Sequence, residues 1–207
     1  MTGVGIYGPL PSPATFVEFY LRLHQKLVIP ASVFDSSWAC QVRHLGDSLR
    51  WSKNVFIHPK NVELGAPLFA SFLDRLILLP PQGCQKLLCT TILLARREAF
   101  RHCIDGGKVR ALQAALGAST VTAILKTTTI YENPLNSSDW RLESLLAEAF
   151  SHIERVCSGS RQTVLGAIKI ALPREMPVIQ SDYSELGFEK LLRDACSLHS
   201  ELTWLFG

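Results

Sequence analysis

Residues 142–157, LESLLAEAFSHIERVC, form the longest regular pattern in the chain and decide its fold class. Apolar side chains recur there at three- and four-residue intervals, which predicts an amphipathic helix with one buried face. The apolar positions are Leu142, Leu145, Leu146, Ala149, Phe150, Ile153, Val156 and Cys157. The charged side chains that lie off this stripe, and are therefore expected on the solvent side, are Glu143, Glu148, Glu154 and Arg155.

Proline residues divide the chain upstream of this helix into further helical segments. Ser12-Pro13 supplies an N-cap and a first helical residue, and the apolar stripe that follows ends at Pro30. Pro67 is expected to open a second helix. The Pro80-Pro81 pair ends that helix and starts a third, whose inward positions can continue as far as Cys103. Residues 31–65 predict one short helix followed by a loop.

Polar and glycine signals define the next two helices. Asp105 can cap a fourth helix, and Gly117 is placed to end it. Ser119 starts a short fifth helix that runs through Leu125, before a run of β-branched residues disfavours its continuation.

The C-terminal part predicts two more helices after the one at residues 142–157. A short helix spans residues 164–172 and is closed by Pro173, and a last helix covers residues 188–205. Because alternation typical of strands is nearly absent, the sequence predicts an all-α fold. We expect an irregular orthogonal bundle of about seven to eight helices with no significant sheet.

The expected domain organisation is a flexible leader at residues 1–13 followed by a single all-helical domain at 14–207. The turn-rich stretch ENPLNSS at residues 132–138 is the place where two subdomains would divide.

Composition narrows the class of protein. Hydrophobic residues make up 47% of the 207 positions and charged residues 19%, so the chain can bury a core and does not resemble a disordered protein. The net charge of +3 is too mild to indicate nucleic-acid binding. The longest apolar stretch, Leu87 to Ala95, is about half of the roughly 20 residues that cross a bilayer. No signal peptide is recognisable, so a cytoplasmic location is expected.

Cysteine usage agrees with that location. Without a secretory signal, the six cysteines are expected to be reduced, and most of them to be small core residues. They are Cys40, Cys84, Cys89, Cys103, Cys157 and Cys196.

The sequence contains no recognisable catalytic, metal-binding or cofactor-binding motif. Phosphate loops, dinucleotide fingerprints, HExxH and GxSxG are all missing from the sequence. Cys84 and Cys89 are five positions apart on one helix, so their side chains diverge by roughly 140°, which disfavours zinc. His102 and Cys103 are adjacent on a helix and do not face each other, which disfavours a nucleophilic site with Asp105.

The densest positive patch consists of Arg96, Arg97 and Arg101, with Lys108 and Arg110 beyond it. One interpretation is a solvated or ion-paired helix face. The other is a protein-docking surface, because arginine is enriched at interfaces. We therefore take Arg96, Arg97 and Arg101 as candidate partner-binding residues.

Several of these segments together resemble the SctK family of type III secretion accessory proteins, the YscK, PscK and OrgA group, which includes rhizobial NolU. The resemblance covers residues 67–125. It is carried by LLPP at 78–81, the arginine pair at 96–97, CIDG at 103–106 and VRALQAALG at 109–117.

This resemblance implies an all-α, non-enzymatic adaptor in the cytoplasmic sorting platform, acting at the inner membrane through protein contacts only. Its partners would be an SctD-like inner-membrane ring protein and an SctQ-like pod protein, with an SctL-like stator and an SctN-like ATPase reached indirectly. A role in nodulation host range would follow from the rhizobial members. The competing hypotheses are a small helical Cys/His enzyme and a helical DNA-binding regulator.

Overall fold

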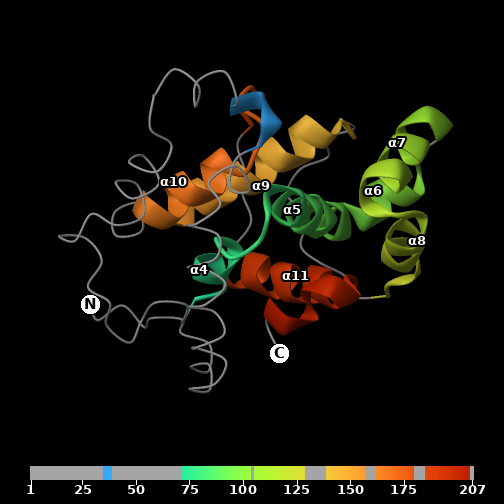
Figure 1. Cartoon of the computed structure of the whole chain (residues 1–207). Helices are drawn as coiled ribbons and strands as arrows, with labels where there is room; N and C mark the ends of the chain where they lie inside the picture. The colour runs from blue at the N-terminus through green and yellow to red at the C-terminus, as the bar shows by residue number, and fades with distance from the viewer. Residues whose placement is uncertain are drawn as a thin grey trace. The chain divides into compact units, whose positions relative to one another are not determined.

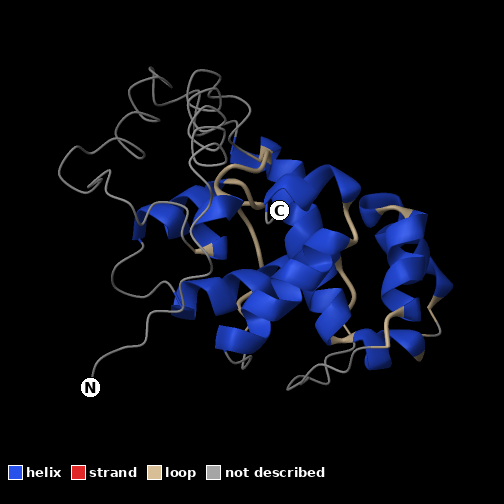
Figure 2. Cartoon of the chain, turned by 90° about the horizontal axis from the view of Figure 1, so that it is seen from below, coloured by secondary structure: helices blue, strands red, loops and turns tan. Residues whose placement is uncertain are grey.

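Helices form all the regular structure in the described part of the chain, and no strand is present there (Figures 1 and 2). The computed structural model therefore confirms the all-α prediction. The predicted leader, the predicted helix ended by Pro30, most of residues 31–65 and the 132–138 stretch lie outside the described residues. Those residues are 35–38, 71–103, 105–128, 139–156, 162–179 and 185–205.

The chain divides into two compact units. The first comprises Met1–Cys84 and Gly159–Arg174, and the second comprises Gln85–Ser158 and Glu175–Gly207. Residues on both sides of the 132–138 stretch belong to the second unit.

In the first unit, a short helix begins at a capping box. Ser71 is extended, its side chain accepts a hydrogen bond from the N–H of Leu73, and Asp74 accepts one from the N–H of Ser71. Helix α4 (Phe72–Leu76) therefore starts after Ser71, so the prediction that Pro67 opens it was wrong. The box satisfies N–H groups that a helix start leaves without partners.

Helix α4 packs against helix α10 (Gln162–Ile170). The backbone N–H of Asp35, next to the 3₁₀ turn η2 (Ser36–Trp38), donates to the carbonyl of Ile170 over 2.9 Å. The Ser37 hydroxyl accepts from the N–H of Arg174 over 2.9 Å. These contacts join two segments of the first unit that are far apart in the sequence.

Helix α5 (Pro81–Ala95) starts at the proline pair, as predicted. Most side chains of the helix are buried, including Cys89, Thr90 and Leu93. The side chains predicted to point inward are all buried, and they are Cys84, Leu87, Leu88, Thr91, Ile92 and Ala95. The Thr91 hydroxyl donates to the carbonyl of Leu87 over 2.7 Å, which satisfies a buried polar group within the helix. Most of α5 is therefore enclosed on all sides.

The third predicted helix does not run without interruption to Cys103. It breaks at Arg96 and resumes as helix α6 (Arg97–Arg101). Asp105 then caps helix α7 (Gly106–Leu116) as predicted, with its carboxylate accepting from the N–H groups of Gly107 and Lys108.

Gly117 separates α7 from helix α8 (Ala118–Lys126) with a φ of 96°, a conformation that glycine adopts without steric cost. Helices α6 and α7 both pack on α8, and the three lie together in Figure 1.

Helix α9 (Leu142–Val156) confirms the amphipathic prediction, except that Glu148, which was expected to face solvent, is fully buried. The physical reason is a buried partner, Arg96, which comes from a distant part of the chain. Ser144 and His152, two further polar residues of the helix, are buried as well.

The last predicted helix is two elements, helix α11 (Glu185–Ser197) and the 3₁₀ helix η3 (Ser200–Leu205). The division falls at Leu198 and at the buried His199, whose ring nitrogen Nε2 lies 2.9 Å from the hydroxyl of Thr90 on α5. The Cys196 thiol donates to the carbonyl of Leu202 over 3.0 Å and holds the two elements together.

Candidate functional site: the arginine cluster

Arg96 lies at the break between α5 and α6 and is only 1% exposed. Its guanidinium forms an ion pair with the buried carboxylate of Glu148 on α9. It also donates to the main-chain carbonyl of Asp139 over 3.3 Å. Arg96 therefore joins the end of α5 to α9 and to the residues before it.

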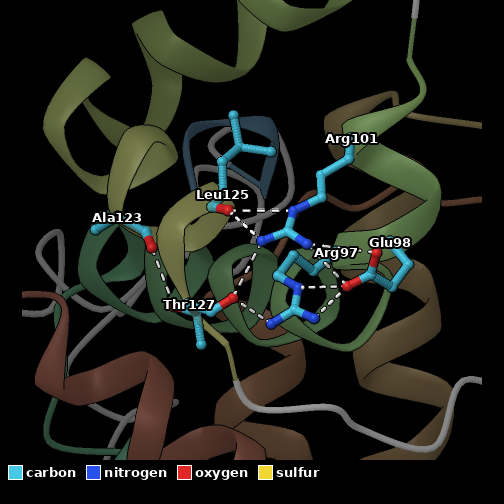
Figure 3. Close-up of polar contacts among 6 residues, drawn as sticks. All are labelled: Arg97, Glu98, Arg101, Ala123, Leu125 and Thr127. Atoms are coloured by element: carbon cyan, nitrogen blue, oxygen red, sulfur yellow. Dashed lines mark hydrogen bonds and ion pairs between the residues drawn. The ribbon is translucent and has the colours of Figure 1, made fainter.

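Arg97 is 4% exposed and points toward the end of α8. It bonds the carboxylate of Glu98 and donates to the carbonyl of Thr127 (Figure 3). Through this contact, the start of α6 is attached to the C-terminus of α8.

Arg101, one turn further along α6, is the exposed member of the cluster. Its Nε and Nη2 atoms donate to the carbonyl of Leu125 over 3.2 and 2.6 Å, and Nη2 also donates to that of Thr127 over 3.3 Å. Its Nη1 atom lies 3.1 Å from the Glu98 carboxylate (Figure 3). A guanidinium has five N–H donors, and these contacts engage each of its nitrogen atoms.

The carbonyls bound by Arg97 and Arg101 belong to the C-terminal end of α8, where the last carbonyl groups have no partner within the helix. Positive charge is favourable at that end because of the helix dipole. Thr127 completes the arrangement, since both its N–H and its hydroxyl donate to the carbonyl of Ala123 over 3.0 Å (Figure 3). Arg97 and Arg101 thus act as a side-chain cap for α8.

The carboxylates beside the cluster are held in their charged form. The hydrogen bond from Arg97 lowers the pKa of Glu98, and the positive charges of Arg101 and Arg97 act in the same direction. Asp139 precedes α9, and hydrogen bonds from Arg141 and Ser144 hold its pKa well below its usual range. The cluster is therefore a network of paired charges at helix junctions.

The structure thus assigns the three candidate residues different positions. Arg96 and Arg97 lie in the interior, and Arg101 is the one a partner could reach. Their partner-binding role stays a prediction, and the burial of the first two restricts it to Arg101. No signal in the sequence pointed to the pairing of Arg96 with Glu148.

The second candidate centre, around His102 and Cys103, is not assembled into a cluster. His102 is exposed, Cys103 is half-buried, and the Asp105 carboxylate is engaged in capping α7. Across the described ranges, no three His, Cys, Asp or Glu side chains are grouped so that they could hold a metal ion. The described cysteines Cys84, Cys89, Cys103 and Cys196 are all free thiols.

Two buried histidines were missed by the sequence analysis. The ring of His152 packs against Phe188 with centroids 4.1 Å apart, and burial together with the charge of Arg155 lowers its pKa to about 4. Burial also lowers the pKa of His199. The carboxylate of Glu201, whose Oε1 atom lies 3.8 Å from Nδ1 of His199, opposes that shift. Both histidines are neutral packing residues near neutral pH.

No helix in the described residues combines the length and the apolar character needed to cross a membrane.

Together, these features define an all-α protein whose clustered charges hold its own helices together. The family described as bacterial type III secretion protein (HrpB4) matches residues 61–194, well over half of the chain. The chain belongs to this family, in agreement with its resemblance to SctK-like proteins, and it has a role in type III secretion. Neither the curated proteins nor the solved structures include a match.

Proposed function

We propose that this protein is a non-enzymatic adaptor of the type III secretion sorting platform. It would join an SctD-like protein of the inner-membrane ring to an SctQ-like pod protein, and through the pod it would reach an SctL-like stator and an SctN-like ATPase. The observation that carries this proposal is membership in the HrpB4 family of secretion proteins.

The arrangement of polar groups supports an adaptor. The side chains of the most prominent cluster form an ion pair and hydrogen bonds to carbonyls at the end of α8; they are Arg96, Arg97 and Arg101. In such a protein, recognition depends on the shape and charge of the outer helix surfaces. Weak contacts are adequate for this role because repeated copies around a ring multiply the overall avidity.

The proposal also includes a location. The adaptor would work in the cytoplasm and gather at the cytoplasmic face of the inner membrane through protein contacts. In a nodulating bacterium, loss of the adaptor would alter host range through loss of secretion.

The test uses the full chain together with two purified partners from the same secretion gene cluster, the cytoplasmic domain of the ring component and the pod protein. We expect the chain to co-elute with each of them and to bridge them in a ternary complex. Deleting its gene should abolish secretion and disperse a fluorescent pod protein from the membrane. If the chain binds neither partner, or if secretion continues without it, the proposal fails.

A further inference from the structure

Helices α6, α7 and α8 lie within a basic segment of the chain, residues 97–128, which we call the basic arm. It contains five basic and two acidic side chains, a formal charge of +3 that equals the charge of the whole chain. The remainder of the chain is therefore neutral in sum, and the net positive charge of the protein resides on this arm.

Part of this charge is neutralised within the arm. Arg97 and Arg101 share the carboxylate of Glu98, and Lys108 lies 3.5 Å from the carboxylate of Asp105. Both acidic side chains of the arm are therefore engaged with cations of the arm itself.

Two basic side chains of the arm remain outside these ion pairs, Arg110 on α7 and Lys126 at the end of α8. Both are exposed, and neither forms an ion pair within the described residues. Lys126 stands between Leu125 and Thr127, whose carbonyls both bind Arg101. Lys126 and the exposed Arg101 are thus neighbours, and they concentrate positive charge where α6 meets the end of α8.

Most of the outer surface of the arm is open. Helix α7 buries only Leu112 and Leu116, while Ala111 and Ala114, on the side away from these two, are exposed and small. A partner surface can therefore come close to α7 without displacing bulky side chains.

We propose that the basic arm docks an acidic protein surface on the ring or pod component of the secretion machine, with Arg110 and Lys126 as the contacting cations. This inference rests on the proposed function and adds the surface used and the chemistry of its partner. Clustered Asp and Glu carboxylates complement the arm, and such complementarity guides association and favours the correct partner.

Two other polyanions fit the arm less well. Single-stranded nucleic acid is bound with aromatic side chains on which bases stack, and the one aromatic residue of the arm, Phe100, is 2% exposed. A membrane-surface helix exposes large apolar side chains between its cations. Within the described residues the exposed large hydrophobic side chain is Val178, which lies outside the arm.

The experiment compares three double variants of the full chain. Arg110→Glu with Lys126→Glu reverses the arm cations, and Arg110→Gln with Lys126→Gln removes them with less disturbance to the end of α8. The matched control is Lys169→Glu with Arg174→Glu, because it changes the net charge equally at exposed positions of the first unit. Lys169 also lies in a last helical turn, as Lys126 does.

Binding is measured by titration against the purified ring domain and pod protein at about 0.05 M and about 0.3 M salt. We expect charge reversal to weaken binding to one of them by about tenfold or more at low salt, the glutamine variant to weaken it less, and the control to bind like the wild type. Circular dichroism should be the same for all of them.

The outcomes separate this inference from the proposed function. If the wild type binds a partner and the arm variants bind equally well, the arm is not the docking surface although the adaptor role stands. If the wild type binds neither protein, the adaptor proposal itself fails. Arm-dependent binding to phosphatidylglycerol vesicles or to a DNA duplex, without binding to either protein, would replace the acidic protein surface by another polyanion.

Discussion

Arg96 and Glu148 form an ion pair in which both side chains are enclosed, with 1% and 0% of their surface exposed. They are 52 positions apart and join the break after α5 to the middle of α9. Burying two charges is costly, and their attraction repays the cost only while both are present. The pair therefore makes the junction of these helices depend on both residues.

Removing one partner is expected to destabilise the protein strongly. Glu148→Ala should lower the free energy of unfolding by about 3–5 kcal/mol, because Arg96 would remain as an uncompensated buried charge. Replacing both residues with Met and Leu should recover most of the loss. Urea denaturation checks this, with the exposed Glu143→Ala as the matched control. A loss for Glu148→Ala no larger than that of the control would contradict the prediction.

The side-chain cap on α8 gives a second prediction. Arg101→Ala should lower stability by about 1 kcal/mol and speed amide hydrogen exchange in the last turn of α8, because the carbonyl of Leu125 loses its side-chain donors and that of Thr127 keeps only Arg97. Arg101→Lys should recover only part of the effect, since an ammonium group does not reproduce the guanidinium fork. Exchange rates in the Ala and Lys variants equal to those of the wild type would disprove the cap.

The sequence predicted those parts of the fold that depend on local signals. The start of α5 at Pro81, the cap at Asp105 and the stop at Gly117 each follow from one or two residues and their backbone chemistry. Such features need no knowledge of distant contacts. The start of α4 was misplaced because the Ser71 capping box, also a local signal, was overlooked in favour of Pro67.

Alanine substitutions at two glycines should change the stability of the protein in opposite directions. Gly117 has a φ of 96°, so Gly117→Ala is expected to destabilise by about 1 kcal/mol or more. Gly166 lies inside α10, where an added Cβ would meet no atom within 4 Å, so Gly166→Ala should stabilise by about 0.4–1 kcal/mol. Thermal unfolding measures both. A stabilising Gly117→Ala would show that the left-handed turn is not required.

The features that the sequence did not reveal depend on partners distant along the chain. Glu148 lies off the apolar stripe of α9 and therefore resembled a solvent-facing charge until Arg96 was placed against it. Similarly, the division between α11 and η3 falls beside His199, whose ring contacts Thr90 on the distant helix α5. Periodicity reports which face of a helix is apolar, but a buried polar residue satisfied by a remote partner leaves no mark in that pattern.

The buried histidines predict a loss of stability in mild acid. The pKa of His152 is lowered to about 4, so between its unfolded value near 6.5 and about 4 the unfolded chain binds the proton more readily. Stability should therefore decrease as pH falls through this window, by at most about 1.4 kcal/mol per pH unit for one histidine. His152→Gln should flatten the profile in denaturant titrations. An unchanged slope in that variant would exclude His152 as the cause.

Thiol labelling tests the packing of the cysteines and, with it, the case against a Cys/His enzyme. Burial raises the pKa of the Cys196 thiol to about 12, and Cys84 and Cys89 are likewise buried, whereas Cys103 is half-buried. In a background with Cys40→Ser and Cys157→Ser, iodoacetamide should therefore modify Cys103 alone in the native protein. The rate should not exceed that of free cysteine, because reactivity follows thiolate character and access. The other three should react only after unfolding.

The labelling rate of Cys103 near neutral pH also discriminates between an adaptor and a Cys/His enzyme. A Cys103 that reacted at least about tenfold faster than free cysteine, and lost this rate in a His102→Ala variant, would indicate an activated nucleophile. That outcome would contradict the adaptor proposal. An ordinary rate, the same with and without His102, is expected because an adaptor does not require an activated thiol.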